Sequence, residues 1–235
     1  MSQIPRDSRV CPCSLRRPDR WRDRTRLELS AYDPLQSSGT RLKRKVLPSL
    51  QLILAMAIAI NIRAEHSSAS GVERLWDQVA AFEDEPSMRA LGYRPHFTFA
   101  IYDSPDIEEK TAWEAMLRAV KDEAQLRIEF RRIRWFVGPP LVLWAEPATD
   151  QVLARWHASI SAIIDPAHCR PHYRPGAWTP HCTLGTRIAD AKSDDAMAFA
   201  RSFDLNITVV FDVVDCVVFP PLRVVAERRL PSGVR

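Results

Sequence analysis

The chain has 235 residues, of which 46% are hydrophobic and 26% charged, a composition typical of a globular protein with its own hydrophobic core. The formal net charge is +4, but residues 1–48 carry a balance of +7 and residues 49–235 a balance of −3. The body of the chain therefore offers no general electrostatic attraction for nucleic acid, and any basic groove in it must be local.

Cysteine usage and hydropathy indicate a cytoplasmic protein without a membrane span. The five cysteines form no C-x-x-C pair and no repeating spacing, which favours reduced thiols over a disulfide framework. The most apolar run, Leu50 to Ile62, is shorter than the roughly 20 residues that a membrane helix needs. A signal peptide would not place nearly fifty residues before its apolar segment.

Residues 1–48 form a basic leader that we expect to be disordered. The segment is rich in Arg, Pro and Ser and contains basic runs over 16–26 and 41–45, so it cannot bury enough apolar surface to offset chain entropy. A nucleic-acid-binding arm is one interpretation of these runs. We favour a non-native extension upstream of Met56, and we place the folded domain at residues 50–232.

The body predicts alternating strands and helices. A buried strand lies within 50–62, bounded by the polar residues Asn61 and Arg63. Further strands are expected at 93–102, 127–137, 141–145, 179–188, 206–211, 213–219 and 224–229, and helices at 72–82, 105–123, 150–164 and 190–203. Because the late strands have short connections, we expect antiparallel pairing and an α+β fold.

Two similar stretches stand out among these elements. They read Tyr93-Arg94-Pro95-His96-Phe97-Thr98 and Trp178-Thr179-Pro180-His181-Cys182-Thr183, and their histidines lie 85 residues apart. In a strand, alternate side chains point to the same face, so each His shares a face with the Thr two residues later. The chain has six histidines, which makes this repetition specific.

Two such histidines suit acid/base chemistry at phosphorus. An imidazole titrates near pH 6.5, so one copy can act as the general base and the other as the general acid. In a phosphodiester the attacking and leaving oxygens lie on opposite sides of the phosphorus, and a threonine hydroxyl can donate to a non-bridging oxygen. The residues alone do not say which histidine is the base.

The tetrapeptides His96-Phe97-Thr98-Phe99 and His181-Cys182-Thr183-Leu184 resemble the repeated motif of the two-histidine (2H) phosphoesterase superfamily. The context is similar to its 2′-5′ RNA ligase-like branch. The similarity covers about residues 52–230, with the apolar first strand and the Gly138-Pro139-Pro140 turn, and the leader has no counterpart.

The resemblance implies a bilobal α+β fold in which two pseudo-symmetric lobes each supply one His-x-Thr strand to a central cleft. It implies that His96 and His181 are the catalytic pair and that Thr98 and Thr183 bind the phosphate. Members cleave 2′,3′-cyclic or related phosphodiesters, or join RNA through 2′-5′ linkages, without a metal. We therefore expect a monomeric enzyme with no cofactor that acts on a nucleotide or RNA end.

Other residues near the motifs are weaker candidates for substrate binding. Tyr93 and Trp178 could stack on a base, although core packing explains them equally well. The loop before the second motif offers His172, Tyr173 and Arg174 at the rim of the cleft. His168, Cys169 and His172 suggest zinc by spacing, but no second ligand pair completes a site, so we expect no metal.

Two alternatives to hydrolysis remain open. One is reversible 2′-5′ RNA ligation with hydrolysis as a side activity. The other is a module that binds RNA or a nucleotide without turnover. The acidic balance of the body favours a small substrate over a long RNA.

Overall fold

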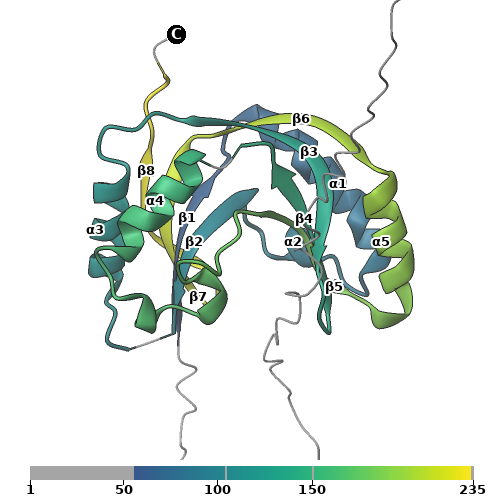
Figure 1. Ribbon diagram of the computed structural model, residues 1–235, viewed down its shortest axis with the longest axis horizontal. Helices are drawn as coiled ribbons and strands as arrows, with labels where there is room; N and C mark the ends of the chain where they lie inside the picture. Colours follow the sequence, from purple (N-terminus) through teal and green to yellow (C-terminus); the bar gives the residue numbers. More distant parts are fainter. Residues whose placement is uncertain (1–55, 104, 150, 234–235) are drawn as a thin grey trace, which may run out of the picture.

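The computed structural model describes residues 56–103, 105–149 and 151–233, so the basic leader and the start of the apolar run lie outside the described residues. Two four-stranded sheets make up the fold (Figure 1). The first has the order β2-β1-β7-β8 and the second the order β5-β4-β3-β6. Every pairing in both sheets is antiparallel, which confirms the predicted α+β class.

The strands of the first sheet are β1 (Ala57–Arg63), β2 (His96–Tyr102), β7 (Val213–Phe219) and β8 (Arg223–Arg229). Those of the second are β3 (Leu126–Phe136), β4 (Leu141–Pro147), β5 (Cys182–Ile188) and β6 (Asp204–Phe211). The helices are α1 (Ser70–Val79), α2 (Ser87–Ala90), α3 (Glu109–Ala119), α4 (Gln151–Ser161) and α5 (Ser193–Ser202).

Helices α1 and α4 each pack against the sheet to which their preceding strand does not belong. Helix α1 follows β1 in the chain but packs on β5 and β6 of the second sheet, whereas α4 follows β4 but packs on β2 and α3 of the first. The units β1-α1-β2 and β4-α4-β5 thus correspond, and each ends on the strand at the edge of its own sheet. These two edge strands, β2 and β5, contact each other at the centre of the molecule. The arrangement agrees with the expected pseudo-symmetric lobes.

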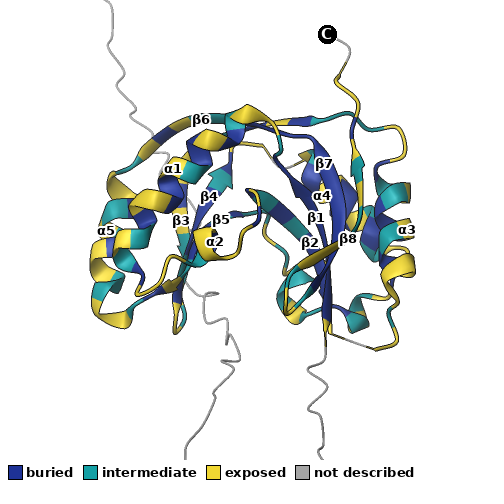
Figure 2. Cartoon of the chain, turned by 180° about the vertical axis from the view of Figure 1, so that it is seen from behind, coloured by how far each residue is buried: buried dark blue, intermediate teal, exposed yellow. Residues whose placement is uncertain are grey.

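The lobes share one continuous hydrophobic core. Phe97 on β2 packs against Phe130 and Phe211 of the second sheet, with ring centroids 6.0 and 4.8 Å apart. Figure 2 shows the strands mostly in the colour of buried residues, with exposed residues on the outer faces of the helices. Because the core spans both sheets, the lobes are held as one body and the strands between them are fixed.

The element boundaries differ from the prediction where polar residues are buried or where a proline delays a strand. Strand β1 continues through Asn61 and Arg63, which are only 2% and 7% exposed, because charged and polar partners from other strands surround them. Strand β5 begins at Cys182, so His181 immediately precedes it. The short helix α2 was not predicted, since four residues carry too little periodicity.

Among the described residues, no helix combines the length and the apolar character that crossing a membrane requires.

Candidate active site

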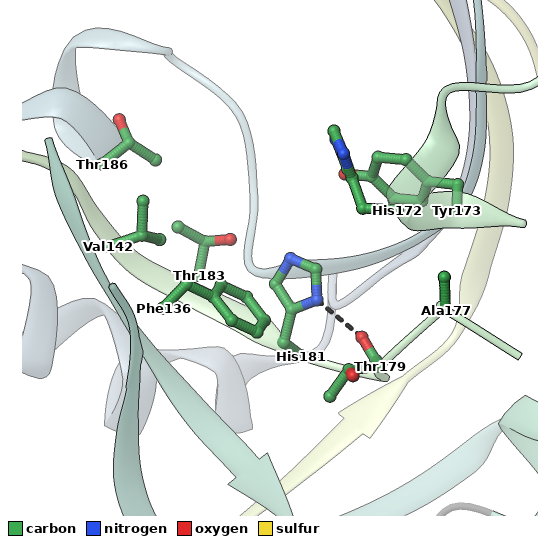
Figure 3. A pocket seen from close by; sticks show the side chains of 9 residues that line it. All are labelled: Phe136, Val142, His172, Tyr173, Ala177, Thr179, His181, Thr183 and Thr186. Atoms are coloured by element: carbon green, nitrogen blue, oxygen red, sulfur yellow. Dashed lines mark hydrogen bonds between the residues drawn. The ribbon is translucent and has the colours of Figure 1, made fainter. Parts of the chain in front are cut away.

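The two motif histidines are oriented by the same hydrogen bond. Nδ1 of His96 lies 2.8 Å from the carbonyl oxygen of Arg94, and Nδ1 of His181 lies 2.7 Å from that of Thr179. A carbonyl oxygen only accepts, so Nδ1 carries the hydrogen in each ring. Nε2 is therefore the nitrogen with a free lone pair in the neutral form. Figure 3 shows this nitrogen of His181 directed away from Thr179.

The structure brings the two motifs together. Their strands β2 and β5 are in contact, and His181 immediately precedes β5 while His96 is the first residue of β2. Burial is the main cause of the lowered pKa of His181, and repulsion from His96 adds to it. Each histidine is half-buried, so both rings lie at the surface where the lobes meet.

Both imidazoles favour the neutral form in this environment. Burial lowers the pKa of His96 and, with added repulsion from His96 and His172, lowers the pKa of His181 to about 4. The carbonyl partners oppose these shifts but do not cancel them. At neutral pH both rings are therefore neutral in the free protein. An anion placed between them would favour protonation of one.

The threonines of the motifs are held through their backbones by reciprocal bonds from tryptophans. The indole of Trp76 on α1 donates to the carbonyl of Thr183 over 3.0 Å, and that of Trp178 donates to the carbonyl of Thr98 over 3.0 Å. Trp76 belongs to the unit β1-α1-β2 and bonds a residue of β5, whereas Trp178 belongs to the unit β4-α4-β5 and bonds a residue of β2. The pair of bonds therefore fixes the position of each motif strand relative to the other unit.

A buried polar cluster lies behind Thr98; we define it as Asn61, Arg63, Tyr93 and Asp215. The Thr98 hydroxyl donates to Oδ1 of Asn61 at 2.8 Å, and Nδ2 of Asn61 donates to Asp215 at 3.0 Å. The hydroxyl of Tyr93 and the guanidinium of Arg63 both donate to the other oxygen of Asp215. All four side chains are at most 8% exposed.

Charges within this cluster are mutually dependent. Burial raises the pKa of Asp215, while hydrogen bonds from Tyr93 and Arg63 act in the opposite direction. For Arg63, burial alone would lower the pKa, but hydrogen bonds with Glu227, Glu65 and Asp215 hold it above its usual range. Direct contact with a guanidinium that stays charged stabilises Asp215 as a carboxylate.

The surroundings of the second motif are aromatic. The ring of Phe136 meets His181 edge-on at 5.1 Å, and Trp144 lies 6.1 Å from the same ring. Phe136 and Trp144 stack on each other at 5.0 Å. A pocket opens beside His181 (Figure 3), and it is lined by Phe136, Val142, His172, Tyr173, Ala177, Thr179, His181, Thr183 and Thr186. His96 and Thr98 are not among its lining residues.

The weaker candidates are placed differently from one another. His172 and Tyr173 line the pocket, whereas Arg174 donates to the carbonyls of Cys169 and Ala167 within its own loop. Trp178 stacks on His157 with ring centroids 4.3 Å apart.

Tyr93 is also engaged from two sides. Its hydroxyl is bonded to Asp215 and its ring lies against His96, 4.8 Å between centroids. Both side chains therefore support the motif strands, and base stacking by Tyr93 or Trp178 stays a prediction.

Sequence reasoning missed Asn61, Arg63, Asp215 and Phe136. A signal was present for Asp215, because it interrupts the apolar run Val213–Phe219, and an acid in a buried strand needs a partner. For metal binding, no group of three or more His, Cys, Asp or Glu within the described ranges is arranged to hold an ion.

Comparisons with known proteins identify the family and the fold. A sequence profile of the 2′-5′ RNA ligase superfamily matches residues 65–219, a span that contains both motifs. Among solved structures, that of TT0787 from Thermus thermophilus superposes with a TM-score of 0.54 at 16% identity, covering 76% of this chain and 100% of that one. At this identity the match supports the fold alone. A search of curated proteins gave no match.

Proposed function

Because the chain belongs to the 2′-5′ RNA ligase superfamily, we propose that it hydrolyses a cyclic phosphodiester, 2′,3′-cyclic or related, at a nucleotide or RNA end. The proposal rests above all on one observation. Both imidazoles bond a carbonyl through Nδ1, which leaves two equivalent Nε2 atoms free to exchange protons. Such a pair can act as general base and general acid without a metal.

In the proposed reaction the two histidines have complementary roles. One histidine takes a proton from water as the water oxygen attacks phosphorus, and the other gives a proton to the departing ribose oxygen. Thr98 and Thr183 share strand faces with the histidines and contact the phosphate and the attacking water. The negative charge of the phosphodiester favours uptake of a proton from solvent by one of two otherwise neutral rings.

The pocket beside His181 supports a small substrate. Its walls include the aromatic rings of Phe136 and Tyr173 with polar groups from His172 and Thr183, a combination that suits a nucleoside next to the reacting phosphate. The body of the chain has no excess of positive charge, which disfavours a long RNA.

The test is an assay with 2′,3′-cyclic nucleotides in the presence of EDTA. We expect turnover that persists under chelation and falls by about 10²-fold or more in both His96→Ala and His181→Ala. His168→Ala is the matched control, because His168 lies outside the pocket, and it should retain activity. Turnover that requires added metal would contradict the proposal.

A second candidate, 2′-5′ RNA ligation, is favoured by the description of the matching superfamily. Supplying RNA halves with a 2′,3′-cyclic end and a 5′-hydroxyl separates the two activities. A joined product that forms faster than the hydrolysed one would assign ligation. Binding of the nucleotide without any product would instead indicate a binding module.

A further inference from the structure

The two motif threonines differ in what their hydroxyls can offer a ligand. The Thr183 hydroxyl makes no hydrogen bond with the part of the chain that the structure describes, and this side chain lines the pocket. The hydrogen of Thr98 is directed to Oδ1 of Asn61 at 2.8 Å. The repeated His-x-Thr sequence gives no hint of this difference, because it arises from a residue on another strand.

The polar cluster determines the direction of that bond. Asp215 receives donors from Arg63, Tyr93 and Asn61, so its carboxylate accepts on both oxygens. The Asn61 side chain must therefore present its NH₂ group to Asp215 and its oxygen to Thr98. An amide oxygen cannot donate, so the proton in this contact belongs to Thr98. Towards the cleft the Thr98 oxygen offers lone pairs only.

A phosphoryl oxygen is a hydrogen-bond acceptor, so it forms no hydrogen bond with a Thr98 oxygen that offers only lone pairs. To donate to it, Thr98 would have to leave the buried oxygen of Asn61 without a partner, which is unfavourable. A water molecule, in contrast, has hydrogens to give. Thr98 shares the face of β2 with His96, so a water that donates one hydrogen to His96 can donate the other to Thr98.

We propose that Thr183 donates to a phosphoryl oxygen, whereas Thr98, with its proton committed to Asn61, accepts a hydrogen bond from the attacking water. Asn61 and Asp215 are then positioning residues that act through Thr98. This inference rests on the proposed function and deepens it. It also places His96 on the side of the nucleophile and His181 on the side of the leaving oxygen.

The step balances in protons and bonds. The water oxygen forms a bond to phosphorus as the bond to the ribose oxygen breaks. One proton of the water passes to Nε2 of His96, and the other remains on the oxygen that becomes part of the phosphate monoester. The ribose oxygen takes the proton of His181. After the product leaves, His96 gives its extra proton to solvent and His181 takes a proton from solvent, which the negative charge of the next substrate favours.

Sulfate tests the two threonines without any turnover, because at neutral pH it accepts hydrogen bonds and donates none. Its dissociation constant is measured from the histidine ring signals in an NMR titration. We expect Thr183→Val to weaken sulfate binding about tenfold or more, whereas Thr98→Val changes it less than about twofold. Thr208→Val on β6 is the matched control and should bind sulfate as the unchanged protein does.

If the proposal holds, removing the Asn61 side chain should strengthen sulfate binding, whereas Thr183→Val weakens it. In Asn61→Ala the Thr98 proton is released, so sulfate should bind several-fold more tightly, and this gain should vanish in Asn61→Ala/Thr98→Val. A purely structural role for Asn61 would not produce a gain that depends on Thr98. If Asn61→Ala fails to fold, as judged by circular dichroism, the sulfate affinities of Thr98→Val and Thr183→Val test the proposal instead.

Kinetics separate this inference from the proposed function. Thr98→Val should lower kcat about tenfold or more at an unchanged KM, and Thr98→Ser should restore it. The inference is overturned if Thr98→Val weakens sulfate as much as Thr183→Val, if KM rises instead of kcat falling, or if the unchanged protein binds no sulfate at this site. If the variants bind sulfate as expected but the protein turns over no cyclic phosphodiester, the proposed function is refuted and the assigned hydrogen-bonding roles of the two threonines stand.

Discussion

His96 and His181 are oriented by carbonyl oxygens, and this choice of partner has a chemical consequence. A carboxylate at Nδ1 would stabilise the imidazolium form, whereas a carbonyl fixes the ring and its tautomer with little added charge. Burial then keeps both rings neutral. The proton needed by the acid is thus acquired together with the anionic substrate, and it is not held in advance.

The lowered histidine pKa values predict how stability depends on pH. Between the ordinary value of about 6.5 and a folded value of about 4 for His181, the unfolded chain binds a proton that the folded chain does not. The free energy of unfolding should therefore decrease as pH falls through this window. The measurement is urea unfolding at pH 7 and pH 5.

The matched variant for this effect is His181→Gln, which cannot titrate. It should lose less stability than the unchanged protein over the same interval. His96, His157 and His172 also have lowered pKa values, so part of the dependence should remain. Equal losses in both proteins would contradict the pKa assigned to His181.

The residues behind the site show where sequence reasoning reaches its limit. Both histidines and both threonines were identified because each pair lies within one tripeptide and repeats. Asn61 was interpreted as a strand boundary, since a polar residue after an apolar run is usually exposed. Its partner Asp215 is 154 residues away, and one sequence does not reveal which distant strands are neighbours.

At the scale of elements, the site depends on two edge strands held by tryptophans from the other unit. The bonds from Trp76 to Thr183 and from Trp178 to Thr98 span 107 and 80 residues of chain. For Trp178 the sequence predicted core packing or base stacking. The indole hydrogens of both tryptophans add a positional role that hydrophobic periodicity cannot indicate.

Replacing either tryptophan by phenylalanine removes the bond and keeps an aromatic ring. We expect Trp76→Phe and Trp178→Phe to lower the free energy of unfolding by about 1 kcal/mol each. Each should also reduce kcat/KM, because the carbonyl of the motif threonine loses its donor. Urea unfolding and steady-state kinetics provide the measurements.

Trp113→Phe is the control for the loss of an indole as such. Trp113 lies on α3, which packs on the outer side of the first sheet against β1 and β7. It should change stability to a similar or smaller extent while kcat/KM stays unchanged. A drop in kcat/KM of the same size in all three variants would show that the indole bonds have no specific effect on the site.

At the scale of the whole molecule, most of the order of strands and helices was predictable from the sequence. The sheet on which each helix packs was not. The strands and longer helices follow from apolar periodicity, and β7 matches its predicted range. That α1 and α4 cross to the opposite sheets depends on packing between distant segments. The bilobal arrangement was therefore available only from the resemblance to a known superfamily.

The domain boundary predicts the effect of removing the leader. Strand β1 begins at Ala57 and pairs along its whole length with β7. A chain that starts at Met56 should therefore melt within about 2 °C of the full chain. Its kcat/KM for a small cyclic nucleotide should stay within about twofold, since the substrate is too small to need a basic arm. A large fall in melting temperature would show that residues before Met56 belong to the domain.

The central claim is that two histidines act as acid and base on one phosphodiester, and the pH dependence of kcat/KM tests it most directly. The base must be neutral and the acid protonated, so the rate should be highest midway between the two pKa values of the free protein. Because both pKa values are lowered, the account predicts a bell-shaped profile with its maximum below about pH 6.5. In His96→Ala and in His181→Ala one limb of the bell should disappear. A profile that is flat, or one that rises to a maximum above about pH 8, would contradict the account.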